Sequence, residues 1–160
     1  MSELLLRGYN VAVPSVDSGD DMYVTDSDAN LMRVQVKSAN CKKKPYGFCG
    51  QVRVRFDQLF EVKKTPLIYI FALRWSERWY YITIHREDLL AEHELHNAGA
   101  VKNDYIWFRF KFYDLQPEDL PPEDPHPNPL PEYREREFVT CSDRDFTRFL
   151  GWEKIFPMES

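Results

Sequence analysis

Three polar side chains near the start of the chain have the types and spacing needed to bind a divalent cation. Asp21 opens a short apolar stretch, and Gln35 and Lys37 lie two residues apart in a later one. Side chains two apart on a strand point to the same face of a sheet. If the two stretches pair as a hairpin, a carboxylate, an amide oxygen and an ammonium group converge. Such a group can hold Mg²⁺ or Mn²⁺ and direct a water molecule toward a phosphate.

The residues around these side chains predict the hairpin. Met22–Thr25 and Leu31–Ser38 have the composition of strands, and the polar residues 26–30 between them are typical of a turn. Upstream, Glu3–Arg7 has the pattern of a short helix, and Gly8 is a usual residue for ending one. The predicted order is therefore a helix, then strands that carry the polar group.

The rest of the chain predicts a β-rich α/β (α+β) fold, with a mixed β-sheet flanked by helices. Residues 67–73 are apolar without interruption, which indicates a central strand covered on both faces. Elsewhere apolar and polar residues alternate, as in strands with one buried face. Further strands are predicted over residues 51–56, 66–75, 79–84 and 105–113, and helices over residues 86–95 and 143–156.

A proline-rich segment interrupts this pattern near the C-terminus. Residues 115–132 hold seven of the eleven prolines, which excludes a helix or an interior strand. We expect one domain overall: a core over residues 1–113, an arm or connector over 114–137, and a strand and helix over 138–160 that pack on the core. The arm either lies over the surface or is exchanged between subunits.

Composition and length favour a folded protein outside the membrane. The chain has 160 residues, of which 43% are hydrophobic and 15% aromatic. No apolar run reaches the roughly 18 residues that span a bilayer, and the N-terminal sequence lacks the features of a signal peptide. The three cysteines suit a reducing compartment, and we expect free thiols and a cytoplasmic location.

Charge is distributed unevenly along the chain. The net charge of −5 argues against a protein that coats nucleic acid without specificity. Between Arg33 and Lys64, however, nine basic residues face two acidic ones. The candidate DNA-binding residues in this segment are Lys42, Lys43, Lys44, Arg53 and Arg55. A solvated lysine loop is the alternative interpretation of the three lysines.

The N-terminal motifs resemble those of a known enzyme superfamily. Gly19-Asp20-Asp21 before an apolar stretch, followed by Arg33-Val34-Gln35-Val36-Lys37-Ser38, resembles the PD-(D/E)XK, or restriction-endonuclease-like, nucleases. The resemblance covers residues 3–38 and implies a core made of a helix, a β-meander and a further helix–strand unit.

The resemblance also implies a role for each residue of the site. It makes Asp21, the oxygen of Gln35 and the backbone carbonyl of Val36 the ligands of Mg²⁺ or Mn²⁺. Lys37 orients the attacking water, and Glu3 is the acidic residue of the first helix. Asp20 fits less well, because its side chain is expected on the opposite face of the strand.

Together these features imply a metal-dependent DNA endonuclease that acts as a homodimer. Two departures from the superfamily pattern keep a second hypothesis open. Gln35 stands where the superfamily usually has an acidic residue, and few residues precede Gly8 to form the first helix. The alternative is a catalytically inactive module of the same fold that binds nucleic acid or a protein partner.

Overall fold

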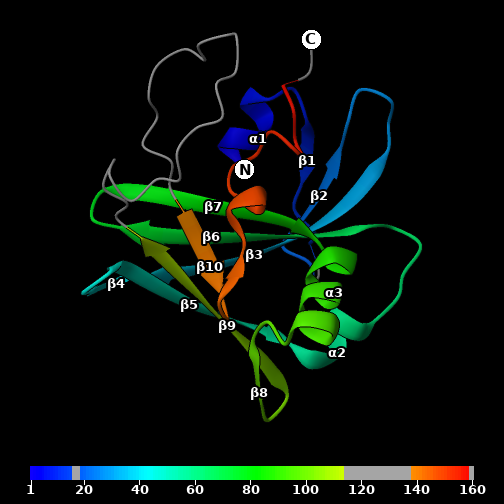
Figure 1. Cartoon of the computed structure of the whole chain (residues 1–160). Helices are drawn as coiled ribbons and strands as arrows, with labels where there is room; N and C mark the ends of the chain where they lie inside the picture. The colour runs from blue at the N-terminus through cyan, green and yellow to red at the C-terminus, as the bar shows by residue number, and fades with distance from the viewer. Residues whose placement is uncertain (16–18, 114–137, 159–160) are drawn as a thin grey trace, which may run out of the picture.

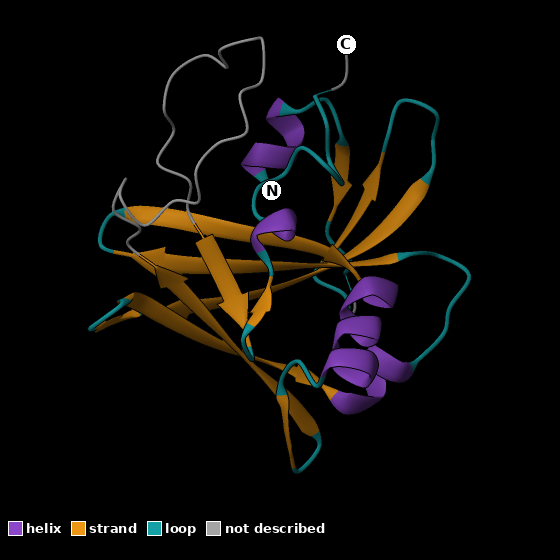
Figure 2. Ribbon diagram, in the orientation of Figure 1, coloured by secondary structure: helices purple, strands orange, loops and turns teal. Residues whose placement is uncertain are grey.

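Two β-sheets packed against each other form the body of the protein in the computed structural model, which describes residues 1–15, 19–113 and 138–158. Three short α-helices lie around the sheets (Figures 1 and 2). The predicted β-rich α+β class is confirmed. The strands, however, divide between two sheets where the sequence pattern indicated one.

The first sheet is mixed and carries the predicted hairpin. Its strand order is β1-β2-β3-β6-β7, and only β3 and β6 run parallel. Met22 pairs with Val34, so the hairpin has the register that places Asp21 opposite Gln35. The strands are β1 (Asn10–Ala12), β2 (Met22–Thr25), β3 (Leu31–Asn40), β6 (Leu67–Trp75) and β7 (Arg78–His85).

The second sheet is antiparallel, with the order β11-β10-β9-β5-β4 and β8 paired to β9. The three lysines of the predicted loop form its edge strand β4, with exposed side chains. The strands are β4 (Lys42–Lys44), β5 (Gly47–Arg55), β8 (Ala100–Lys102), β9 (Tyr105–Tyr113), β10 (Phe138–Cys141) and β11 (Arg144–Asp145).

The helices are short and lie at different places around the sheets. They are α1 (Ser2–Leu6), α2 (Phe56–Phe60) and α3 (Arg86–His96). As predicted, α1 ends before Gly8, whose φ of 96° lies in the left-handed region that glycine accepts. In the described parts of the chain, no helix has the length and apolar character needed to cross a membrane.

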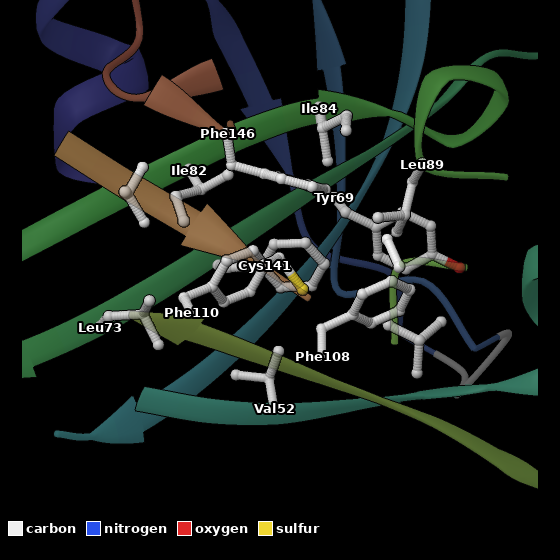
Figure 3. Packing of buried hydrophobic residues seen from close by; sticks show 14 of the residues in the cluster. Val52, Tyr69, Leu73, Ile82, Ile84, Leu89, Phe108, Phe110, Cys141 and Phe146 are labelled. Atoms are coloured by element: carbon white, nitrogen blue, oxygen red, sulfur yellow. The ribbon is translucent and has the colours of Figure 1, made fainter. Parts of the chain in front are cut away.

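The main core lies between the two sheets. Inward side chains of β5 and β9 meet those of β6 and β7, and Figure 3 shows Val52, Phe108 and Phe110 facing Tyr69 and Leu73. A smaller core lies on the other face of the first sheet, beneath α1. Because the first sheet is covered on both faces, β6 is apolar from Leu67 to Leu73, whereas β9 alternates.

The C-terminal segment contradicts the predicted helix over residues 143–156. Ser142 and Asp143 have φ values of 50° and 63° and form the tight turn between β10 and β11. A single 3₁₀ turn, η2 (Thr147–Phe149), follows. Phe146 is buried in the main core and Trp152 in the smaller one, so the apolar spacing reflects two separate surfaces.

The predicted domain division remains a prediction from the sequence. The proline-rich arm lies outside the described residues. After it, β10 pairs with β9 over Phe138 to Cys141, so this segment adds to the second sheet.

The three cysteines are free thiols, and burial raises the pKa of Cys41 and of Cys141 to about 11.

Replacing Phe110 by alanine tests the main core. This fully buried ring lies 5.2 Å from the ring of Phe71 and 5.6 Å from that of Phe146, measured between centroids. We expect Phe110→Ala to lower the free energy of unfolding by about 3–5 kcal/mol in urea denaturation. Val62→Ala is the control, since that side chain is 79% exposed. Equal effects of the two changes would contradict the assigned core.

Candidate functional site

The structure brings Asp21 and Gln35 into direct contact. The backbone N–H of Asp21 donates at 3.0 Å to the carbonyl of Val34, the residue with which Met22 pairs, and so holds Asp21 against β3. Its carboxylate Oδ2 accepts a hydrogen bond from the N–H of Val36 at 2.7 Å and another from the amide Nε2 of Gln35. Asp21 is exposed and Gln35 is buried, so the pair marks a border between core and solvent.

The backbone of Val36 takes part because β3 is longer than β2. Arg33 donates its N–H to Pro66 on the β6 side, so by alternation the N–H and carbonyl of Val36 face the β2 side. At this level β2 has ended, and the carboxylate of Asp21 takes the place of a strand partner. The Val36 carbonyl that was predicted as a metal ligand therefore faces the same edge as Asp21.

Gln58, on α2, completes this polar group and was not singled out from the sequence. Its Nε2 donates to Oε1 of Gln35 at 2.8 Å and to the carbonyl of Gly19 at 2.6 Å. It lies 23 residues from Gln35 in the chain. No local sequence pattern predicts this contact, because it depends on where the chain places α2, which follows β5, relative to the first sheet.

Lys37 lies on the same face of β3 as Gln35, one pleat further along the strand, a step of roughly 7 Å. It is half-buried and pairs in register with Phe71 of β6. The structure thus places Asp21, Gln35 and Lys37 on one face of the first sheet, where β2 begins beside the middle of β3.

Asp20 lies on the site side of the sheet, contrary to the expectation that it points away. Its carboxylate accepts two hydrogen bonds from Arg33, from Nε at 2.8 Å and from Nη2 at 2.9 Å. Arg33 lies two residues before Gln35 on β3, so the two side chains are on the same face of the sheet. The strand alternation does not extend to Asp20, because β2 begins only at Met22. Both side chains of the ion pair are buried, and the bond to Asp20 raises the pKa of Arg33.

A buried tyrosine and a second arginine lie close to this ion pair. Tyr69 pairs in register with Gln35 and is fully buried, and among the described residues its hydroxyl has no hydrogen-bond partner. Burial raises the pKa of Tyr69, and the charges of Arg86 and Arg33 oppose that effect. Arg86 in turn donates to the carbonyl of Leu59 at 3.0 Å and so anchors α3 to α2.

Glu3 does not join the other predicted site residues. Its carboxylate accepts a hydrogen bond from Nε of Arg7 at 2.8 Å, and Arg7 also donates to the carbonyl of Phe156 at 3.0 Å. Leu4 of the same helix packs with Val34 in the smaller core. That core contacts the even-numbered side chains of β3, so α1 covers the face opposite Gln35.

The predicted DNA-binding residues fall into two groups at opposite ends of β5. The three lysines of β4 are exposed, and Lys42 pairs with Cys49. Arg53 and Arg55 are exposed on the outer face of the second sheet, and Arg55 lies roughly 20 Å from Cys49 along the strand. The arginine end is the one that continues into α2 and Gln58.

The site offers oxygen donors suited to a hard cation. Across the described ranges, no group of three or more His, Cys, Asp or Glu side chains is placed to hold a metal. Asp21, the amide oxygen of Gln35 and the carbonyl of Val36 would make a sparse, all-oxygen set, which suits Mg²⁺ with most of its water retained. Gln35 would have to turn its amide, since its nitrogen now faces Asp21. That turn would disturb the bond from Gln58.

Removing one member of the Asp20–Arg33 ion pair should destabilise the fold strongly. Arg33→Met leaves a buried carboxylate without its partner, and we expect the free energy of unfolding to fall by about 3–5 kcal/mol. The double variant Asp20→Asn, Arg33→Met should be more stable than Arg33→Met alone, because the isolated charge is gone. Urea denaturation of the wild type, both single variants and the double variant measures the coupling. Strictly additive effects would show that the two side chains act independently.

Comparisons with known proteins add no relative from which a role could be transferred. No protein-family model matches the chain, and no curated protein or solved structure is a match to it. A functional conclusion therefore depends on the side chains described above.

Proposed function

We propose that this protein is a metal-dependent endonuclease that hydrolyses phosphodiester bonds in DNA. The observation that carries the proposal is the meeting of the Asp21 carboxylate, the Gln35 amide and the Val36 backbone, with Lys37 on the same face of β3. These are the groups that the resemblance to the PD-(D/E)XK nucleases assigns to catalysis.

The order of the elements supports a restriction-endonuclease-like core within the first sheet. Helix α1 precedes the antiparallel meander β1-β2-β3, and after an excursion into the second sheet α2 leads to β6, which pairs parallel to β3. This is the helix, meander and helix–strand sequence that the resemblance implies. The second sheet would then be an insertion between β3 and α2, continued by the later strands.

Each residue of the site would have a defined task. Asp21, Gln35 and the Val36 carbonyl would hold Mg²⁺ or Mn²⁺, which when bound offsets phosphate charge and acidifies a coordinated water. The Lys37 ammonium would hold the attacking water and balance charge that develops on the phosphate. Gln58 would position Gln35, to which it is hydrogen-bonded. A homodimer and a cytoplasmic location remain predictions from the sequence.

A second candidate function is a nucleic-acid-binding module that lacks catalysis. Two observations favour it: Gln35 brings no charge to the cation, and Glu3 lies on the opposite face of the sheet. Under this hypothesis DNA affinity would be independent of metal and barely changed by Asp21→Ala.

A plasmid-nicking assay with Mg²⁺ and with Mn²⁺ separates the two functions. We expect Lys37→Ala and Asp21→Asn to lower the cutting rate by about 100-fold or more, because each removes a group that acts on the reacting phosphate or its water. The control is Lys154→Ala, an exposed lysine in the C-terminal segment. Circular dichroism would confirm that each variant is folded. Cutting that survives in Lys37→Ala at the wild-type rate would refute the proposed site.

Gln35→Glu tests the metal site without relying on activity. Without metal, the new carboxylate faces that of Asp21, and we expect the free energy of unfolding to fall by about 1–3 kcal/mol. Millimolar Mg²⁺ or Mn²⁺ should then raise the melting temperature of this variant more than that of the wild type, because bound ligand stabilises the folded state. The double variant Asp21→Asn, Gln35→Glu should lose most of that response. A melting temperature insensitive to both metals in Gln35→Glu would argue against a cation site here.

A further inference from the structure

The outer face of four strands of the second sheet, β4, β5, β8 and β9, carries basic and no acidic side chains. On β5 and β9 the side chains that point away from the core are those at odd positions, and pairing in register extends this face to β8 and β4. No acidic residue occupies an outward position on these four described strands. The basic residues there are Lys42, Lys44, Arg53, Arg55, Lys102, Arg109 and Lys111.

Aromatic rings lie within this basic face. Arg53 lies over the ring of Tyr105 at 4.6 Å and over that of Trp107 at 5.8 Å, measured to the ring centroids. Arg53 is exposed and both rings are half-buried. A guanidinium stacked on an aromatic ring is itself a flat surface that a nucleobase can cover. Neighbouring Arg109 and Lys102 provide positive charge on either side of this stack.

In the part of the chain that the structure describes, acidic side chains lie at the margins of this face, with Asp57 and Asp104 beside Arg55 at one end. Arg55 forms an ion pair with Asp57 on α2, and Lys111 forms one with Asp143 in the turn after β10. The middle of the face, at Arg53, Trp107 and Arg109, carries the stack. This face concentrates positive charge on a protein whose net charge is negative. The contrast points to a polyanion as the partner of the face.

We propose that this face binds single-stranded nucleic acid, with bases stacked on the Arg53–Tyr105–Trp107 group and phosphates on the flanking basic residues. Stacking platforms within a positively charged groove are the usual means of holding single strands. A duplex presents phosphates but few free base faces, so it would use the charges and not the stack. An acidic peptide would likewise gain little from the rings.

The Arg53–Tyr105–Trp107 group, the binding platform, is linked along the chain to the candidate active site through α2. Arg55 ends β5, and within one helical turn Gln58 contacts Gln35 and Gly19. A hollow of about 600 Å³ lies at this end of the platform, between the start of α2 and the β8–β9 turn, and Arg55, Asp57 and Tyr105 are among its lining residues. The path of the bound strand toward Asp21 rests on the proposed function. The binding platform itself does not.

Fluorescence anisotropy with labelled oligonucleotides, in EDTA and at low salt, tests the platform. The probes are an oligo(dT), an oligo(U) of equal length and a blunt DNA duplex. The variants are Arg53→Ala, Arg53→Lys and Trp107→Ala. A matched control comes from the first sheet, where Arg74 lies over Trp79 at 5.8 Å, so Arg74→Ala and Trp79→Ala remove a similar stack elsewhere. Thermal melting establishes that each variant is folded.

We expect the wild type to bind a single strand more tightly than the duplex. Arg53→Ala and Trp107→Ala should each weaken single-strand binding by about fivefold or more, the effect of losing one base stack. Arg53→Lys should weaken it as well, because the lysine keeps the charge but lacks the plane. The control variants should bind as the wild type does. The relative affinity for oligo(dT) and oligo(U) shows which of these two strands, DNA or RNA, the platform prefers.

Several results would overturn the inference. Wild-type affinity for the duplex equal to or above that for single strands would do so, as would full retention of binding in Arg53→Lys together with Trp107→Ala. Because no metal is present, these outcomes are independent of nicking. A protein that binds single strands through Arg53 but never cuts would refute the nuclease alone. One that cuts normally while both platform variants bind normally would refute the platform alone.

Discussion

The parallel pairing of β3 with β6 is the contact on which both cores and the candidate site depend. It joins the N-terminal hairpin to β7 and places Gln35 beside Tyr69 at the centre of a sheet covered on both faces. Polar side chains at such a position lose their water and must find partners within the protein. Asp20 and Arg33 satisfy each other, and Gln35 lies between Asp21 and Gln58.

This requirement gives the site two layers with different physical roles. The deeper layer, the Asp20–Arg33 ion pair, is closed to solvent and holds the start of β2 against β3. The outer layer, Asp21 with Gln35 and the Val36 N–H, is held by hydrogen bonds that a cation could replace. Because Gln58 on α2 is hydrogen-bonded to Gln35, a rearrangement of the Gln35 amide would change the contact with that helix.

The sequence predicts the parts of the fold in which local pattern and tertiary environment agree. Strands β2, β3 and β9 and helix α3 fall close to their expected positions, and β6 is apolar from Leu67 to Leu73 because both its faces are buried there. The juxtaposition of Asp21 with Gln35 follows from the hairpin register alone. The failures lie where pattern alone is ambiguous. Phe146 and Trp152 have a helix-like spacing but face different cores, and the contact of Gln58 depends on a distant turn. Division of the strands between two sheets depends on long-range pairing that periodicity does not encode.

Strand β4 has a consequence for how copies of this protein meet. An edge strand offers unpaired backbone groups, which invite a second sheet to add to it. Here that edge is made of Lys42, Lys43 and Lys44, all exposed. Two such edges brought together would set six ammonium groups against one another, so joining of two sheets through β4 is unfavourable. High ionic strength screens this repulsion and would weaken the effect. The lysines of β4 therefore disfavour edge-to-edge aggregation, and a dimer of this protein would form through another surface.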